Sequence, residues 1–499
     1  MGKYTLDNKL DNKLDKYTKL DNKLDKYTKL DNKLDKYTKL DNKLGKYAKF
    51  NAESSAKLGS STKLSFKTLS FRESNFQENK ERRNEGNNET DEDNDGTDDM
   101  LQVNLLKLFS AEIPLDELNK IGPVKIRDAH TLEFAGVPEE KAQTRFLFLL
   151  SASFKELKNR LTGNTATYVH KNSGIPLIGN VSFGIVYRNS SIIEIKPVTS
   201  CNLNCIYCSI SEGLESKKHD FVVEKDYLLE ELQKLISFVS EQVEVHIGVQ
   251  GEPFLYAGIE ELIADLQAMK NVQAISIDTN GTLLSREIIA RLAKNDKLQL
   301  NFSLDSLNEQ KAKEIAGINS YNVNHIKELI AYACKKLKRV VIAPVYVPGY
   351  NDKDLEDIIL FVKSITPQPV LGIQNFLSYK TGRNPLKSNS VNSGRGIPWN
   401  KFYPLLENLE KKHSIKLIWT KEDFGVRKTK ELPKPFKEGD VVNAVIKCPD
   451  RFPNTSIAAA GGRSISLLNC LFRAGKAEKK VKVKIVKEKH NIFTGKVIK

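Results

Sequence analysis

The chain has 499 residues, and its 78 Lys and Arg outnumber its 63 Asp and Glu, which gives a formal net charge of +15. This length accommodates about two to four domains, and the positive charge favours anionic partners without specifying a fold. No run of eighteen apolar residues occurs and the N-terminus is polar, so we expect neither a membrane-spanning helix nor a secretory signal.

Residues 1–48 repeat a decapeptide close to Asp-Lys-Tyr-Thr-Lys-Leu-Asp-Asn-Lys-Leu. A period of ten drifts by about 80° per repeat around an α-helix, so the leucines form no lasting apolar stripe. We therefore expect a disordered arm, with self-association or RNA contact as alternatives. Residues 49–100 read as a polar linker that ends in an acidic run at 89–99. We assign residues 1–100 to a disordered arm and linker.

Apolar residues become frequent from Leu101, and residues 145–161 have the pattern of one helix. Two strand-like pieces follow at 181–187 and 192–195. We expect residues 101–190 to form a small α+β module, and we find no chemistry in it.

From residue 192 onward, apolar strands alternate with amphipathic helices. Strands are expected at 192–195, 243–249, 274–277, 298–304, 339–345, 370–376 and 416–419. Helices are expected at 228–239, where four apolar residues lie on one helical face, and at 258–269, 286–294, 321–336, 353–364 and 400–411. Such alternation implies parallel strands joined by right-handed crossovers. We predict an α/β fold whose residues 191–425 form a partial (βα)6 barrel, with ligands at the C-terminal ends of its strands.

Three cysteines, Cys201, Cys205 and Cys208, follow the first of these strands, and Tyr207 precedes the last of them. Soft thiolates bind iron–sulfur clusters, Cu(I) or zinc, and three ligands in one short loop suit a cubane cluster whose fourth metal stays open. The alternatives are a zinc loop with a distant fourth ligand, or buried thiols without a metal. With half of the six cysteines in one loop, the chain fits a reducing cytoplasm better than a disulfide framework.

This loop resembles the CxxxCxΦC signature of the radical S-adenosylmethionine (SAM) enzymes, with Tyr207 at the aromatic position. The resemblance implies a [4Fe–4S] cluster on the three cysteines, and an open iron that binds SAM. An electron from the cluster would cleave SAM to a 5′-deoxyadenosyl radical, so an electron donor such as ferredoxin or flavodoxin is expected. As a whole, the chain is similar to uncharacterised archaeal-type radical SAM proteins.

Later strand ends carry segments similar to the family's SAM motifs. Residues 250–253, Gln-Gly-Glu-Pro, resemble its Gly-Gly-Glu-Pro motif, with Gln250 in place of the first glycine. Residues 278–282 and 303–306 look like positions that hold the SAM carboxylate and ribose, and 345–352 resemble the adenine-side loop. Taken singly, these segments could be an ordinary turn or helix N-caps. The resemblance implies a SAM site made of Gly251, Glu252, Pro253, Thr279, Asn280, Ser303 and Asp305.

Beyond the sixth strand, Lys380 and Arg383 are expected at the barrel mouth. We interpret them as anion-binding substrate contacts, and the alternative is a solvated loop.

Residues 434–499 contain five short apolar pieces separated by glycines, which predicts a small barrel of the oligonucleotide-binding type. The segment holds 15 Lys and Arg against 5 Asp and Glu, a net charge of +10. Residues 436–442 and 481–485 resemble a TRAM domain, an RNA-binding module of several tRNA-modifying enzymes. RNA contacts are then expected at Lys479, Lys480, Lys482 and Lys484. Alternatively, the lysines only increase solubility.

We predict a radical SAM enzyme that modifies a base in tRNA or other RNA. Two alternatives are a radical SAM enzyme that acts on a peptide or small metabolite, with the basic domain as an accessory, and a non-catalytic RNA-binding protein with a structural cluster. No cysteine precedes Cys201, unlike in RNA methylthiotransferases, and residues 101–195 lack the pattern of a cobalamin domain. Cys334 is expected in a core, and Cys448 and Cys470 are a reactive pair or buried structural thiols.

Overall fold

The computed structural model describes residues 25–26, 61–73, 99–248, 250–386, 396–473, 475 and 477–498. The described chain divides between Tyr168 and Val169 into two compact units, and we describe each by itself. Most of the decapeptide repeat lies outside the described residues, so its disorder stays a prediction.

The first unit contains two antiparallel sheets and a long helix. One sheet has the order β3 (Leu69–Glu73), β4 (Met100–Leu105), β5 (Phe109–Pro114), β8 (Lys158–Asn159), and the other has the order β2 (Thr62–Ser65), β7 (Thr131–Phe134), β6 (Val124–Asp128). The helices are α4 (Leu115–Asn119) and α5 (Glu139–Ser153). Phe146 of α5 contacts Phe66, Phe71 and Phe134, with ring centroids 5.3, 6.0 and 6.4 Å away. This aromatic cluster is the core of the unit.

The predicted limits of this unit are wrong at both ends. Residues 61–73 were expected in a disordered linker, yet they form β2 and β3, which pair with β7 and β4. Leu64 and Phe66 are buried, as are Leu69 and Phe71, and the spacing of two residues within each pair was the strand signal. At the other end, β10 (Gly184–Tyr187) pairs with β11 (Ile192–Lys196) of the second unit, not with the predicted module at 101–190.

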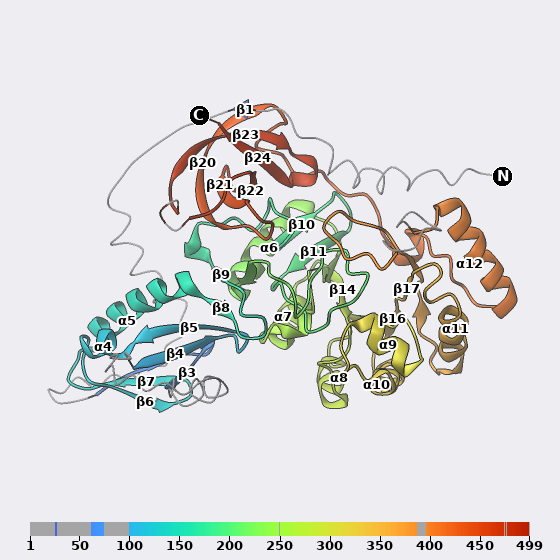
Figure 1. Cartoon of the computed structure of the whole chain (residues 1–499), viewed down its shortest axis with the longest axis horizontal. Helices are drawn as coiled ribbons and strands as arrows, with labels where there is room; N and C mark the ends of the chain where they lie inside the picture. The colour runs from blue at the N-terminus through green and yellow to red at the C-terminus, as the bar shows by residue number, and fades with distance from the viewer. Residues whose placement is uncertain are drawn as a thin grey trace, which may run out of the picture. The chain divides into compact units, whose positions relative to one another are not determined.

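The second unit is built on a seven-stranded sheet (Figure 1). Its order is β10, β11, β13 (Val243–Ile247), β14 (Val272–Thr279), β15 (Leu298–Phe302), β16 (Arg339–Ile342), β18 (Val370–Leu371). All neighbours after β10 pair in parallel. The helices are α6 (Lys225–Val239), α7 (Ile259–Ala268), α8 (Arg286–Leu292), α9 (Glu309–Ala316), α10 (Val323–Lys336), α11 (Asp354–Ser364) and α12 (Trp399–His413). The predicted partial (βα)6 barrel is confirmed.

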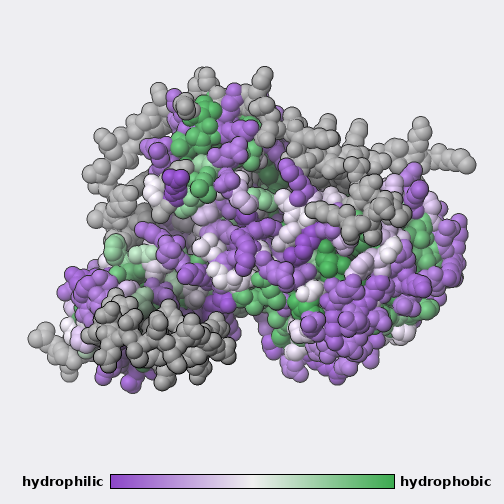
Figure 2. All heavy atoms as spheres, viewed as in Figure 1, coloured by the Kyte–Doolittle hydropathy of each residue, from purple (hydrophilic) through white to green (hydrophobic). Residues whose placement is uncertain are grey.

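Residues alternate in character along the central strands. Val245, Ile247, Ile275 and Ile277 are completely buried. The alternate positions carry Glu244 and His246 on β13 and Ser276 and Asp278 on β14, and His246 lies directly opposite Ser276. Parallel strands buried on both faces usually read as continuous apolar runs, so this alternation gives the sheet one polar face. The outer surface over α8, α9 and α10 is hydrophilic, as amphipathic helices require (Figure 2).

The strand predicted at 416–419 does not form. The amides of Leu417 and Ile418 donate to Oε1 of Glu410 on α12, at 2.6 and 2.9 Å, and not to a neighbouring strand. The indole of Trp419 donates to the carbonyl of Leu371 at 2.8 Å, which attaches this segment to β18. Two further short strands, β17 (Val345–Tyr346) and β19 (Gln374–Asn375), pair in parallel beyond the sheet.

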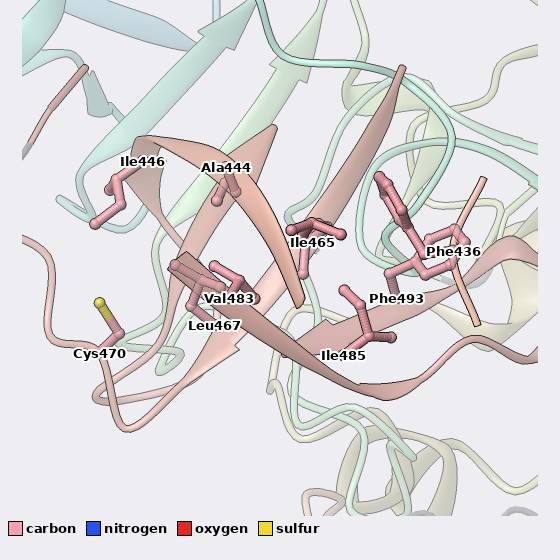
Figure 3. Close-up of a cluster of buried hydrophobic side chains, with 11 residues drawn as sticks. Phe436, Ala444, Ile446, Ile465, Leu467, Cys470, Val483, Ile485 and Phe493 are labelled. Atoms are coloured by element: carbon pink, nitrogen blue, oxygen red, sulfur yellow. The ribbon is translucent and has the colours of Figure 1, made fainter. Parts of the chain in front are cut away.

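The last part of the chain is a small closed barrel. Its strands β20 (Asp440–Pro449), β21 (Ser456–Ala460), β22 (Arg463–Leu468), β24 (Phe493–Ile498) and β23 (Lys480–Lys487) are neighbours in that order, and β23 pairs back with β20. A two-residue strand, β1 (Asp25–Lys26), also pairs with β20. Figure 3 shows the buried side chains of the core, including Ala444, Ile465, Val483 and Ile485. The prediction of a five-stranded barrel is confirmed.

Candidate active site

A cavity of about 410 Å³ lies where the parallel strands end. Cys201, Cys205 and Cys208 line it, together with six of the seven residues predicted to bind SAM: Gly251, Glu252, Thr279, Asn280, Ser303 and Asp305. Pro253 does not line it, because this residue begins the short helix η4 (Pro253–Leu255) and is buried. The structure thus gathers segments that are up to about a hundred residues apart.

The cysteine loop is held by backbone hydrogen bonds. The amides of Asn204 and Ile206 donate to the carbonyls of Ala316 and Ile315 at the end of α9, at 2.9 and 3.0 Å. Hydrogen-bond donors face the sulfurs: the amide of Glu212 lies 3.3 Å from Sγ of Cys208, and Nδ2 of Asn280 lies 3.9 Å from Sγ of Cys201, which the backbone of Leu203 also faces.

The donor set of this loop fits a [4Fe–4S] cluster. Burial raises the pKa of Cys201 to about 12 and that of Cys205 well above its usual value, so bare thiolates are unfavourable there and iron ligation would offset this cost. Within the described ranges, no three metal-binding side chains converge as the ligands of a single ion would. A cubane has no such requirement, because each thiolate binds its own iron.

Gly251 shapes the wall next to the cysteines. Its φ of +125° lies in a region that L side chains rarely adopt, and an added Cβ would lie 1.9 Å from the carbonyl oxygen of Ser200. The amide of Glu252 donates to that same oxygen at 2.8 Å. The backbone before Cys201 and the backbone after β13 therefore touch, which only glycine permits.

The carboxylate of Glu252 connects two walls of the cavity. It accepts hydrogen bonds from Oγ1 of Thr279 at 2.9 Å, the amide of Asn280 at 2.8 Å and the amide of Phe254 at 3.1 Å. Burial raises its pKa to about 7, although these three donors oppose the shift. Glu252 thereby fixes the end of β14, where Thr279 and Asn280 lie.

Asp305 organises the opposite wall. Its Oδ2 accepts from the hydroxyl of Tyr207 at 2.5 Å, and its Oδ1 accepts from the amide of Val345 at 2.7 Å. Burial raises the pKa of Asp305 to about 6. The aromatic residue of the cysteine loop is therefore attached to the fourth and fifth strand ends.

Asp278, which begins the predicted segment 278–282 but is not one of the seven residues expected to bind SAM, also lines the cavity. Oδ2 of Asp278 lies 3.1 Å from Nε2 of His246, and its Oδ1 accepts from Nδ2 of Asn301 at 2.9 Å. Burial lowers the pKa of His246, but the nearby Asp278 outweighs this and the pKa is raised overall. The sequence signal for this polar group was a polar residue at every second position of the adjacent strands β13, β14 and β15. Asp278 is thus an oriented hydrogen-bond acceptor at the cavity wall.

Neither of the two residues predicted to contact substrate, Lys380 and Arg383, lines this cavity. Lys380 is exposed and does not line the cavity. Arg383 donates from Nε to the carbonyl of Cys205 at 2.7 Å and from a terminal nitrogen to the carbonyl of Glu212. Its guanidinium therefore holds the cysteine loop, and fewer of its N–H groups remain for the predicted contact with an anion.

A partial (βα)6 barrel with three cysteines at the end of its first parallel strand defines the class of radical SAM enzymes. The sequence model of the Radical SAM superfamily matches residues 195–362. The uncharacterized protein MJ0103 of Methanocaldococcus jannaschii is 31% identical over 424 residues, which cover 80% of this chain and 95% of that protein. The chain belongs to the radical SAM superfamily, and it is an enzyme.

Other relatives match over a smaller part. The GTP 3',8-cyclase of Listeria monocytogenes is 29% identical over 181 residues, 35% of this chain and 51% of the cyclase. That of Alkaliphilus oremlandii is 32% identical over 174 residues, 34% of this chain and 52% of the cyclase. A solved structure of TYW1 with a lysine-pyruvate adduct bound has 22% identity and a TM-score of 0.34, over 49% of this chain and 80% of that one.

The cofactors of this enzyme are the [4Fe–4S] cluster and SAM of its superfamily. Cys334, Cys448 and Cys470 are buried, in agreement with structural thiols. Among the residues that the structure describes, no helix has the length and apolarity to cross a bilayer. The cytoplasmic location stays a prediction.

Proposed function

We propose that this enzyme modifies a base in a structured RNA such as tRNA. Cys201, Cys205 and Cys208 would hold the cluster, and the bound cluster would supply the electron for SAM cleavage once reduced by a donor such as ferredoxin or flavodoxin. Gly251 and Glu252 would contact the SAM amino group. Thr279, Asn280, Ser303 and Asp305 would bind its carboxylate and ribose.

The observation that carries this proposal is a basic face on the C-terminal barrel. On β23, Val481, Val483 and Ile485 pack into the core, so Lys480, Lys482 and Lys484 lie on the outer side. Lys484 lies directly opposite Lys496 of β24. Cationic side chains gathered on one face are what recognition of a nucleic-acid backbone requires. We call Lys480, Lys482, Lys484 and Lys496 the lysine face.

Asp278 supports a base as the target. A carboxylate with both oxygens already positioned by His246 and Asn301 presents only acceptors to the cavity. Nucleobases carry amino and imino N–H groups that pair with such acceptors, and enzymes that act on bases read them in this way after removing them from the stack.

A small nucleotide is the second candidate, because the GTP 3',8-cyclases of Listeria monocytogenes and Alkaliphilus oremlandii are 29% and 32% identical to part of this chain. A nucleotide also offers N–H donors to Asp278. A nucleotide substrate would give no role to the lysine face. A comparison of substrate fractions distinguishes the nucleotide from RNA.

The test compares substrate fractions from one cell extract. Anaerobically reconstituted enzyme is mixed with SAM, a reductant and either small RNA, nuclease-digested RNA, a peptide fraction or a small-molecule fraction. We expect only intact RNA to stimulate 5′-deoxyadenosine formation and to yield a new modified nucleoside by mass spectrometry. A Cys201→Ala variant is the control for cluster dependence. Stimulation by the small-molecule or peptide fraction, with none by intact RNA, would refute the RNA proposal.

A further inference from the structure

Arg451 of the C-terminal barrel reaches a buried site beside the cysteine loop. It lies in the turn between β20 and β21, and its side chain is 3% exposed. The guanidinium forms ion pairs with Glu212 and with Oδ1 of Asp220, the latter at 3.0 Å, and both carboxylate side chains are 2% exposed. It also donates to the carbonyl of His219 at 3.0 Å.

The two carboxylates adjoin opposite ends of the cysteine loop. Glu212 lies four residues after Cys208, and its amide faces that residue's Sγ at 3.3 Å. Asp220 begins β12 (Asp220–Val223) and accepts from Oγ1 of Thr199 at 2.7 Å, two residues before Cys201. One guanidinium from a different domain therefore connects the entry and the exit of the loop.

The charges of this triad must stay paired. Two carboxylates and one guanidinium are withdrawn from water, and a buried charge that loses its partner is strongly destabilising. Burial lowers the pKa of Arg451 to about 9, so the guanidinium is still charged at neutral pH. Loss of this cation would leave two buried carboxylates, one near each end of the cysteine loop, without their ion pairs to it.

We propose that Arg451 is a positioning residue of the cluster site, through which the C-terminal barrel fixes the conformation and the electrostatic field of the cysteine loop. The inference does not depend on RNA as the substrate. Partners of this kind around metal ligands typically change metal affinity by about 10- to 100-fold when they are replaced. The C-terminal barrel is accordingly part of the cluster site, whatever else it binds.

The test uses the full chain and reads the cluster itself. Arg451→Met keeps the volume and removes the charge, and Arg463→Met is the matched control. Arg463 belongs to the same barrel but contacts Asn491 and the carbonyl of Pro433, away from the cysteine loop. After anaerobic reconstitution, iron loss to a chelator is timed and the midpoint potential is measured by an EPR-monitored redox titration.

We expect Arg451→Met to lose iron about tenfold faster than wild type, with a midpoint potential shifted to more negative values because a nearby cation is gone. Arg463→Met should match wild type in both. Glu212→Gln is the second variant, which removes an anion and keeps the backbone donor to Cys208. Glu212→Gln should shift the midpoint potential to more positive values. This variant tests the inference on its own if Arg451→Met does not fold.

Opposite shifts from these two variants would not arise from a general loss of stability. Potentials and iron-loss rates that equal those of wild type and Arg463→Met would overturn the inference. A shift of the same sign in both variants would also overturn it.

Discussion

The lysine face makes the salt dependence of RNA binding predictable. Changing Lys480, Lys482 and Lys484 to Gln removes three charges and leaves the inward residues of β23 untouched. These three lysines extend over about 13 Å of strand, at roughly 3.3 Å per residue. Each can therefore meet a different phosphate of one RNA strand.

The magnitude follows from counterion release. Each phosphate contact contributes about 0.7 to the slope of log K against log salt for a single strand, and about 0.9 for a duplex. Three lost contacts should flatten the slope by about 2.1 to 2.7. Wild type should then lose about 20- to 40-fold more affinity than the variant when salt rises from about 50 to 200 mM, a fourfold increase.

The assay is fluorescence anisotropy with a labelled tRNA transcript, at five or more salt concentrations, on apo full-length protein. A control variant changes Lys294, Lys335 and Lys411 to Gln, three exposed lysines outside the C-terminal barrel, and it has the same net charge. Its slope should equal that of wild type within about one unit. Equal slopes for the two triple variants would show that the whole charge of the chain, and not the lysine face, attracts RNA.

Three further predictions concern the site and the fold. Gly251→Ala should abolish cluster and SAM binding, measured by iron content and calorimetry, because its Cβ would overlap the carbonyl of Ser200; near-normal SAM affinity would contradict this. Removing residues 1–99 should destabilise the first unit by roughly 6 kcal/mol or more, since four buried side chains of 61–73 are lost. A variant without residues 1–60 is the control. Equal melting curves for these two truncated variants would contradict the assignment of β2 and β3. Asp278→Asn should cost stability mainly below about pH 6.5. Because the pKa of His246 is raised in the folded protein, its ion pair with Asp278 stabilises the fold at low pH, and this stabilisation is lost as the pH rises through the pKa of folded His246. The ion pair also needs an ionised Asp278, so the stabilisation is present only above the lowered pKa of Asp278. Urea unfolding from pH 5 to 8 measures this, and a mutational cost that is constant with pH would be contrary to it.

The cysteine loop and the barrel could be predicted because their signals are local. Three thiols in eight residues and the alternation of strands with helices depend on short spacings that the sequence displays directly. The strand ends then converge on one cavity because parallel strands end on the same side. For the same reason, six of seven expected SAM residues line that cavity.

The errors came from segments whose structure depends on distant partners. Strand β3 joins β4, about thirty residues later in the chain, and a polar, acidic stretch between them concealed the pairing. Residues 416–419 have strand composition, but Glu410 satisfies the backbone donors that a strand would need. Arg451 is 239 residues from Glu212, and no periodicity relates the two positions.

The position of Arg451 changes how the role of the C-terminal barrel can be tested. Deleting residues 434–499 would remove the lysine face and the guanidinium together, so loss of RNA modification would follow equally from lost RNA binding or from a lost cluster. Variants at Lys480, Lys482 and Lys484 avoid this, because these lysines lie on the outer side of β23 and Arg451 lies in the turn between β20 and β21. If both proposals hold, lysine-face variants keep iron and reductive SAM cleavage and lose RNA, whereas Arg451→Met loses iron and keeps RNA binding. That reciprocal pattern, measured on the full chain, separates delivery of a substrate from maintenance of the cluster within one small barrel.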